Sequence, residues 1–235
     1  MSDTGVHRST AVPAGRGALI VFDVDGTLFE ADLVTPEAVR RVFSRHGLPD
    51  PGIDAVRRYL GRPVAEYEAW VMSLCPPDRA RQVLEETNAA ELELIGTAGR
   101  LYPGVVEMLA ALRAAEHVLA VCSNGPYRYV ERFLDVHGVR PFMAAVQARD
   151  CRTITKAEMA AELLARFPGC RPAFFVGDRE DDMSAARANG MIPVGVAYGG
   201  FGGEHELAGA SHLLRDPRDL PELVARYLRG DVPFR

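Results

Sequence analysis

Short hydrophobic runs alternate with longer amphipathic stretches along most of the chain. The runs are rich in Val and Phe and are apolar at successive positions, which suits strands buried on both faces of a parallel sheet. We predict strands at residues 18–24, 118–122, 142–147, 173–177 and 192–198. Helices are predicted between them, at residues 103–115, 126–137, 156–166 and 180–189. This alternation is typical of a doubly wound α/β fold with a parallel sheet.

One segment interrupts the alternation. Residues 30–100 contain no convincing strand, and their hydrophobic positions follow a helical period, with proline and glycine near both ends. We therefore predict a helical insert, residues 33–99, after the first strand. The α/β domain would comprise residues 17–32 and 100–235. Residues 1–16 are small, polar and rich in structure breakers, which predicts a disordered tail.

Composition narrows the classes of function. Hydrophobic residues make up 48% of the 235 residues, enough to bury a sizeable core. The formal net charge is −5, which argues against a general nucleic-acid binder. The sequence has no membrane-spanning run and no signal peptide, so we expect a cytoplasmic protein that binds no membrane. Its cysteines lack metal-site spacing and are expected to be reduced thiols: Cys75, Cys122, Cys151 and Cys170.

Polar residues follow three of the predicted strands, in the segments FDVDGTL, CSNG and VGDREDD. In an open parallel sheet, ligands bind beyond the carboxyl ends of the strands. If these three strands are neighbours, the following side chains converge at one edge of the sheet: Asp23, Asp25, Ser123 and Asp178.

The acidic residues of this set favour a metal site. Asp23 belongs to a hydrophobic run, where an unpaired carboxylate is costly. Asp178 and Asp182 add like charges, which a divalent cation would offset. Carboxylate oxygens without a nearby soft ligand suit Mg²⁺. One such acid alone would be a helix cap or turn residue, and Glu180 and Asp181 fit a helix N-terminus equally well. The whole set at successive strand ends favours the metal.

Two further residues are candidates for binding a phosphate. Ser123 lies between a strand and a helix, where its hydroxyl and nearby N–H groups could hold a phosphate oxygen, although a turn serine explains it as simply. Lys156 is the only lysine of the chain. It begins a predicted helix, where the helix dipole disfavours a cation. The other residues counted as Lys+Arg are all arginines, and the compact, mobile ammonium of a lysine differs from their planar guanidinium groups. A site residue and a solvated surface residue are equal alternatives for Lys156.

Together these residues resemble the haloacid dehalogenase (HAD) superfamily of phosphohydrolases. FDVDGTL is similar to its first motif, CSN to the second, and VGDREDDM to the fourth, while Lys156 stands where the third motif has its lysine. The resemblance runs from about residue 17 to residue 228. Residues 33–99 resemble the helical C1 cap of this superfamily, and the C-terminal half resembles its phosphoglycolate phosphatase-like group. That group often has Lys-Pro at the third motif, whereas Lys156 is followed by Ala157.

The resemblance implies Mg²⁺-dependent hydrolysis of a small phosphorylated metabolite. Asp23 would form an aspartyl-phosphate, and Asp25 would protonate the leaving group and then activate water. The implied metal ligands are Asp23, the backbone carbonyl of Asp25, Asp178 and, in support, Asp182. The phosphoryl group would be bound by Ser123, Asn124 and Lys156.

The cap segment adds Arg62, which could pair with a carboxylate or second phosphate of the substrate. A solvated arginine at a helix start is an equal alternative. A phosphomutase similar to β-phosphoglucomutase would use the same aspartates and Mg²⁺, and a non-catalytic binding protein on this fold is a more distant alternative. The sequence leaves open the substrate and the oligomeric state, monomer or homodimer.

Overall fold

The computed structural model describes residues 17–149, 154–201 and 204–232. The predicted tail, residues 1–16, and Cys151 lie outside this part of the chain. A six-stranded sheet forms the centre of the molecule, and its strand order is β3-β2-β1-β4-β5-β6. All neighbouring strands are parallel: β1 (Leu19–Phe22), β2 (Val118–Ser123), β3 (Met143–Ala148), β4 (Ala173–Gly177), β5 (Ile192–Val196) and β6 (His212–Leu214).

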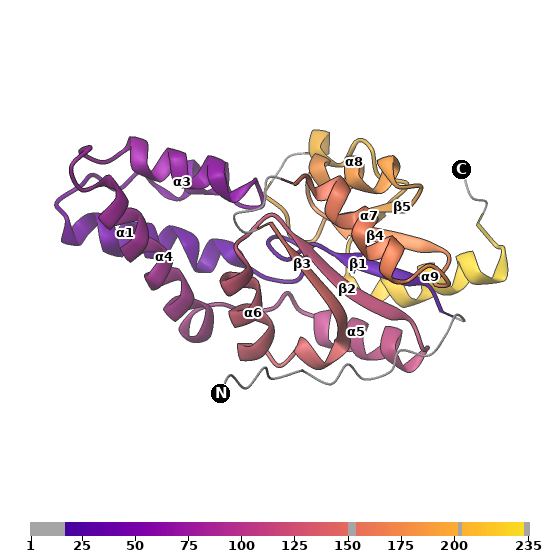
Figure 1. Ribbon diagram of the computed structural model, residues 1–235. Helices are drawn as coiled ribbons and strands as arrows, with labels where there is room; N and C mark the ends of the chain where they lie inside the picture. Colours follow the sequence, from indigo (N-terminus) through magenta and orange to yellow (C-terminus); the bar gives the residue numbers. More distant parts are fainter. Residues whose placement is uncertain (1–16, 150–153, 202–203, 233–235) are drawn as a thin grey trace, which may run out of the picture.

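Helices cover both faces of this sheet (Figure 1). One face packs against α7 (Lys156–Arg166) and α8 (Glu180–Ala188), and the other against α5 (Val105–Ala114), α6 (Tyr127–Val136) and α9 (Leu220–Arg229). The doubly wound α/β prediction is therefore confirmed.

The alternate residues of β1 show why the central strands are hydrophobic throughout. Leu19 and Val21 belong to the hydrophobic cluster beneath α7 and α8, whereas Ile20 and Phe22 belong to the cluster on the opposite face. Successive side chains of a strand point to opposite faces, so a strand covered on both sides needs apolar residues at every position.

The five predicted strands are present, with ends shifted by a residue or two. The prediction missed β6, which lies at the edge of the sheet. It has only three residues, and just one of them, Leu214, is buried. A strand this short carries too little hydrophobic periodicity to be recognised from the sequence.

The chain between β1 and α5, which the structure describes throughout, forms four α-helices and no strand. They are α1 (Thr35–Arg45), α2 (Ile53–Arg57), α3 (Val64–Ser73) and α4 (Ala80–Thr97). They have their own hydrophobic cluster, which includes Val42, Phe43 and Val71. Figure 1 shows α1, α3 and α4 side by side, beyond the end of the sheet. α2 is short and ends at Arg57, because turns lead from there into Gly61, whose φ is +75°.

The two chain segments that join these helices to the sheet lie next to each other. Phe29 forms an antiparallel bridge with Leu101, and the N–H of Glu30 donates to the carbonyl of Arg100 at 2.9 Å. The N–H of Tyr102 donates to the carbonyl of Leu28 at 3.1 Å. The helical segment therefore leaves and re-enters the α/β part through one paired linker, close to the carboxyl end of β1.

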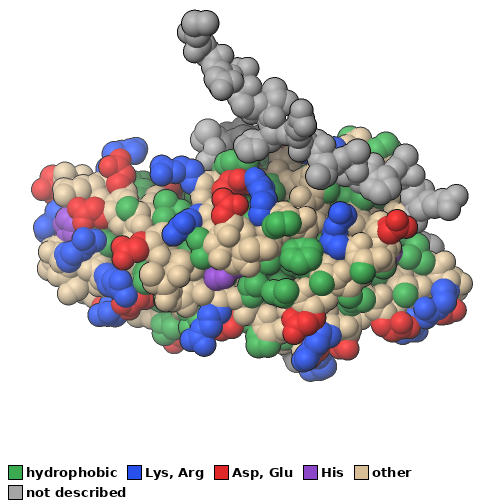
Figure 2. All heavy atoms as spheres, turned by 90° about the horizontal axis from the view of Figure 1, so that it is seen from below, with side chains coloured by type: hydrophobic (Ala, Val, Ile, Leu, Met, Phe, Trp, Pro, Cys, Tyr) green, Lys and Arg blue, Asp and Glu red, His purple; other side chains and the backbone are tan. Residues whose placement is uncertain are grey.

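The surface is mixed in charge. On the face shown in Figure 2, positive and negative side chains are interspersed, with hydrophobic side chains between them. Within the part of the chain that the structure describes, no helix combines the length and the apolar character needed to cross a membrane.

Candidate active site

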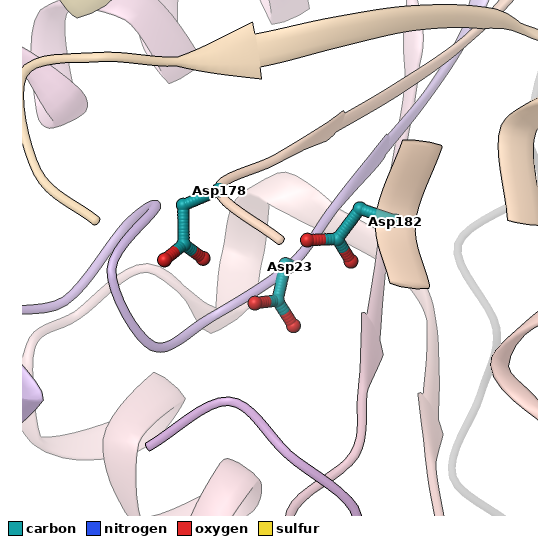
Figure 3. Close-up of side chains that lie close together, drawn as sticks. All are labelled: Asp23, Asp178 and Asp182. Atoms are coloured by element: carbon teal, nitrogen blue, oxygen red, sulfur yellow. The ribbon is translucent and has the colours of Figure 1, made fainter. Parts of the chain in front are cut away.

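Three aspartates converge at the carboxyl end of the sheet. Asp23 directly follows β1, Asp178 directly follows β4, and Asp182 lies in the first turn of α8. All three are buried, and one carboxylate oxygen from each lies within 4.8 Å of the others. Figure 3 shows the three carboxylates approaching one another from these separate elements. They meet because β1 and β4 are neighbours in the sheet and both strands end at the same edge.

Two glycines make this approach possible. Gly26 has a φ of +80°, and a Cβ there would lie 2.5 Å from Oδ2 of Asp178. A Cβ on Gly177 would lie 2.2 Å from Cγ of Asp182. Both distances are shorter than a real Cβ contact, so a side chain at either position would push a carboxylate out of the cluster.

Backbone groups orient two of the carboxylates. The N–H of Arg179 donates to Oδ2 of Asp182 at 2.9 Å, and the N–H of Phe201 donates to Oδ2 of Asp178 at 3.1 Å. By contrast, Oδ2 of Asp23 and Oδ1 of Asp178 are buried and have no hydrogen-bond partner among the described residues. Buried polar atoms are nearly always satisfied, so these two oxygens are in the state expected of ligands to a cation.

Lys156 lies inside the cluster and is 0% exposed. Its Nζ is 2.9 Å from Oδ1 of Asp23 and 2.5 Å from Oδ1 of Asp182. Burial alone would lower the pKa of Lys156, but Asp182 and Asp23 outweigh that effect and raise it well above its ordinary value. The surface-lysine alternative is therefore wrong. A capping box, in which Thr155 and Glu158 exchange hydrogen bonds, lets the helix begin at this lysine.

The aspartates carry more negative charge than Lys156 can balance. Burial raises the pKa of Asp23, and Lys156 opposes this shift. Burial also raises the pKa of Asp178 well above its ordinary value, and that of Asp182 to about 7. Such shifts arise when like charges share a desolvated site. The three carboxylates and one ammonium therefore form a site that can bind a divalent cation, which would supply the missing positive charge.

The carboxylate of Asp25 is not a member of this cluster. Its Oδ1 accepts a hydrogen bond from the hydroxyl of Tyr129 at 2.8 Å. Burial raises the pKa of Asp25 to about 6, although the Tyr129 hydrogen bond opposes the rise. A carboxyl group with a pKa near neutrality can both give and take a proton, which suits a general acid/base.

Ser123 and Asn124 follow β2, the other neighbour of β1. Oγ of Ser123 accepts from the N–H of Gly125 at 3.0 Å, which leaves its own hydroxyl hydrogen available. The amide of Asn124 donates to the carbonyl of Gly61 at 3.1 Å and to Asp181 at 2.8 Å. Asn124, predicted to contact substrate, here links the sheet to the helical segment.

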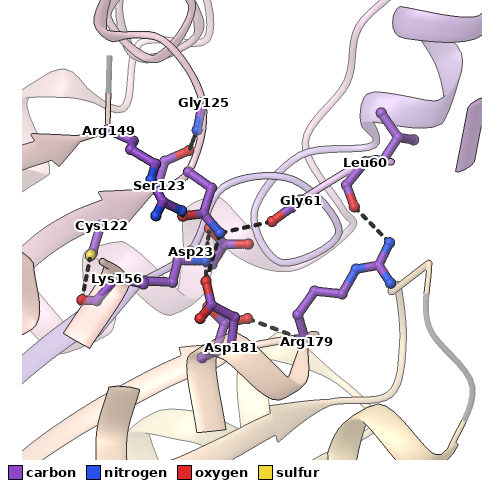
Figure 4. A network of polar contacts seen from close by, with 12 residues as sticks. Asp23, Leu60, Gly61, Cys122, Ser123, Gly125, Arg149, Lys156, Arg179 and Asp181 are labelled. Carbon is purple, nitrogen blue, oxygen red and sulfur yellow. Dashed lines mark hydrogen bonds and ion pairs between the residues drawn. The ribbon is translucent and has the colours of Figure 1, made fainter. Parts of the chain in front are cut away.

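Arg179 is a polar residue of this site that the sequence did not single out. Its side chain is almost completely buried, and Nη2 donates to the carbonyl of Leu60 at 2.6 Å (Figure 4). Nη2 also donates to the carbonyl of Arg57 at 3.2 Å. Nη1 donates to Glu206 at 2.9 Å. Arg179 therefore connects residues 57–60 of the helical segment to the loop that follows β4. Without knowledge of the partners, an arginine within GDREDD carries no signal of this role.

A small cavity of about 60 Å³ lies between the sheet and the helical segment. The sheet side contributes Asp25, Gly125 and Tyr129. The opposite wall includes Arg62, Tyr67 and Glu91. Arg62 is half exposed and pairs with Glu66 at 3.5 Å. The structure thus places Arg62 beside Asp25, at the wall of a cavity, and not in the aspartate cluster.

Comparison with known proteins gives a consistent picture. The family model described as haloacid dehalogenase-like hydrolase matches residues 18–190. A phosphoglycolate phosphatase of Synechococcus elongatus is 32% identical over 221 residues, which cover 89% of this chain and 98% of that protein.

Two solved structures share the fold. A protein of Haemophilus somnus, named as a predicted phosphoglycolate phosphatase, has a TM-score of 0.79 and 24% identity, covering 88% of this chain and 97% of that one. A Thermotoga maritima protein, named as a proposed beta-phosphoglucomutase, has a TM-score of 0.73 and 22% identity, covering 89% and 99%. At these identities the likeness shows the fold alone.

Proposed function

The chain belongs to the haloacid dehalogenase-like hydrolase family, and from that premise we propose that it is a phosphatase of a small phosphorylated metabolite, with Asp23 as its nucleophile. One observation carries the proposal. Asp23 presents a buried, unpartnered carboxylate oxygen beside the ammonium of Lys156 and the carboxylates of Asp178 and Asp182. An oxygen with no partner in a strongly polar, buried site is placed to react or to bind a cation, and the family assignment favours both.

The residues fit a divalent cation, and we propose Mg²⁺. Its ligands would be Asp23, Asp178 and the backbone carbonyl of Asp25, with Asp182 in support. All donors are oxygens, which matches the preference of this ion. When bound, the cation offsets the charge of a phosphate that approaches a carboxylate.

In the proposed reaction, a carboxylate oxygen of Asp23 attacks phosphorus, and the bond from phosphorus to the leaving oxygen breaks. Asp25 donates its proton to that oxygen. Asp25 then takes a proton from water, whose oxygen attacks the aspartyl-phosphate and releases inorganic phosphate and free Asp23. The Ser123 hydroxyl and the Lys156 ammonium would bind the remaining phosphoryl oxygens. Ser123 ends β2, which pairs with β1, and the ammonium of Lys156 contacts Asp23 directly.

We further propose that residues 33–99 act as a cap over an α/β core of residues 17–32 and 100–235. The separate hydrophobic cluster of the helices and the paired linker support this division. Arg179 and Asn124 would hold the cap closed, since both bond to carbonyls at its edge. Closure would exclude water and leave the leaving group in the cavity beside Asp25. A cytoplasmic location is part of the same proposal.

The substrate is the open part of the proposal. The Synechococcus relative is named a phosphoglycolate phosphatase, so 2-phosphoglycolate is the first substrate to test. A phosphomutase is the second candidate, because the Thermotoga structure shares the fold. The names of the more similar relatives favour hydrolysis over transfer.

The test is release of inorganic phosphate from p-nitrophenyl phosphate by the purified full-length protein. We expect activity with Mg²⁺, loss of activity in EDTA, and recovery when Mg²⁺ is added in excess. A phosphomutase would instead transfer phosphate between two sugar positions with little net release. Full activity in metal-free protein would contradict the metal assignment.

A further inference from the structure

The cavity beside Asp25 contains a second carboxylate that the proposed chemistry does not use. Glu91 comes from α4, and only 9% of it is exposed. The hydroxyl of Tyr67 donates to its Oε1 at 3.2 Å. Acidic residues inside a helix are normally on its solvated face, and a buried one needs a compensating partner.

Two tyrosine hydroxyls of this cavity are engaged by its carboxylates. Tyr67 donates to Glu91, and Tyr129 donates to Asp25. Arg62 brings a positive charge, but it is half exposed and lies 3.5 Å from Glu66. The cavity is therefore lined by two carboxylates, Asp25 and Glu91, and by one basic side chain, Arg62, which is half exposed to solvent.

The protonation behaviour of Glu91 agrees with this arrangement. Burial raises its pKa to about 7, a hydrogen bond from Thr35 opposes the rise, and the charge of Asp25 adds to it. A group that donates a hydrogen bond or carries positive charge would stabilise the ionised form. A carboxylate brought to the same place would add a third negative charge to a desolvated pocket.

We propose that Glu91 selects the leaving group: the enzyme prefers phosphate esters whose alcohol carries a hydroxyl or an ammonium group over those whose alcohol carries a carboxylate. This inference rests on the proposed phosphatase function and concerns the same site. The cavity is small, which limits the leaving group to a few heavy atoms. Glu91 would contact the leaving group directly, while Asp25 would protonate the bridging oxygen of that group.

A matched set of two-carbon phosphates tests the proposal. The set is 2-hydroxyethyl phosphate, O-phosphoethanolamine, 2-phosphoglycolate and ethyl phosphate, with p-nitrophenyl phosphate as the reference. The assay is kcat/KM with Mg²⁺ at pH 8, above the pKa of about 7 to which burial raises Glu91. We expect the wild-type enzyme to favour the hydroxyl and ammonium substrates over 2-phosphoglycolate by at least about tenfold, because like charges in such a pocket are strongly unfavourable.

The variant Glu91→Gln keeps the shape of the side chain and its acceptor for Tyr67 but removes the charge. It should reduce the preference by about tenfold, mainly by improving 2-phosphoglycolate. The control is Glu93→Gln, an exposed residue of the same helix, which should leave the ratio unchanged. Thermal unfolding of each variant checks that it is folded.

The outcomes separate this inference from the proposed function. A wild-type preference for 2-phosphoglycolate, or a ratio that Glu91→Gln leaves unchanged, would overturn the role of Glu91 while the phosphatase assignment stands. Absence of Mg²⁺-dependent hydrolysis for every substrate, including p-nitrophenyl phosphate, would overturn the function itself. If Glu91→Gln does not fold, the wild-type ranking of the four two-carbon substrates decides.

Discussion

Two polar regions meet at Asp25, and they are built in different ways. The first region is the buried cluster of Asp23, Asp178, Asp182 and Lys156, whose members lie at strand ends and helix starts around one edge of the sheet. The second region is the cavity lined by Glu91, which forms only where the helical segment packs over that edge. The first region comes from the sheet topology and the second from contact between two separately packed parts.

The difference also concerns charge. In the cluster, two carboxylate oxygens of the described residues have no hydrogen-bond partner, and a bound cation would offset the excess negative charge. In the cavity, each buried carboxylate has a tyrosine hydroxyl as partner, so no metal is needed. We infer that chemistry resides in the first region and choice of substrate in the second. Substitutions should therefore affect all substrates alike in the cluster, and substrates unequally in the cavity.

The largest effect is expected from Asp23→Asn. The amide has nearly the shape of the carboxylate but cannot attack phosphorus, so kcat should fall by at least about 10⁴-fold on every substrate. Steady-state and single-turnover release of nitrophenol measure this. The control is Asp135→Asn, an exposed acid of α6. Near-normal turnover in Asp23→Asn would mean that another residue carries the phosphoryl group.

Lys156→Met should mainly reduce stability. It removes the one buried cation paired with Asp23 and Asp182, and loss of one partner from a buried ion pair typically costs about 3–5 kcal/mol. Urea unfolding in EDTA measures the free energy of unfolding. Arg166→Met, at the exposed end of the same helix, should stay within about 0.5 kcal/mol of wild type. Equal stability of the two variants would show that Lys156 contributes no net stabilisation.

Asp25→Asn should depend on the leaving group, since Asp25 lies where the two regions meet. An alkoxide needs a proton as it leaves, so an alkyl phosphate should react about 10²–10⁴-fold more slowly. Nitrophenolate needs that proton much less. With p-nitrophenyl phosphate the aspartyl-phosphate should accumulate, giving a burst of nitrophenol before a slow steady state.

Rapid-mix kinetics distinguish the roles of the two aspartates. Asp23→Asn serves as the control here, because it should give no burst with either substrate. If Asp25→Asn shows neither a burst nor a dependence on the leaving group, a structural or metal-binding role is the better assignment for Asp25.

The smallest effect is expected from Arg62→Ala. Its exposed ion pair with Glu66 contributes little, so stability should change by less than about 1 kcal/mol. Turnover of p-nitrophenyl phosphate should stay within about threefold, whereas a substrate with a second phosphate should lose about tenfold, because Arg62 would pair with that group. The control is Arg58→Ala, an exposed arginine nearby. An equal loss on both substrates would point to a structural role.

Much of the fold was predictable because its information is local. The five longer strands are hydrophobic at every position, and their helices follow a clear period, so the α/β pattern and the helical segment are visible in the sequence. Asp23 and Asp178 were candidates because each follows a predicted strand, whereas Lys156, at a helix start, was left open between a site residue and a surface residue until the family resemblance was considered. The edge strand β6 was missed because three residues, of which only one is buried, leave no pattern.

The sequence by itself determined which elements form and which polar residues follow them. Only the tertiary structure decided what those residues face. It buried Lys156 between Asp23 and Asp182, turned Asn124 and Arg179 toward the carbonyls of residues 57–61, and enclosed Glu91 beside Asp25. Propensity and periodicity act over a few neighbouring residues. These contacts join positions far apart in the chain, and they exist only once the sheet and the helical segment have packed together.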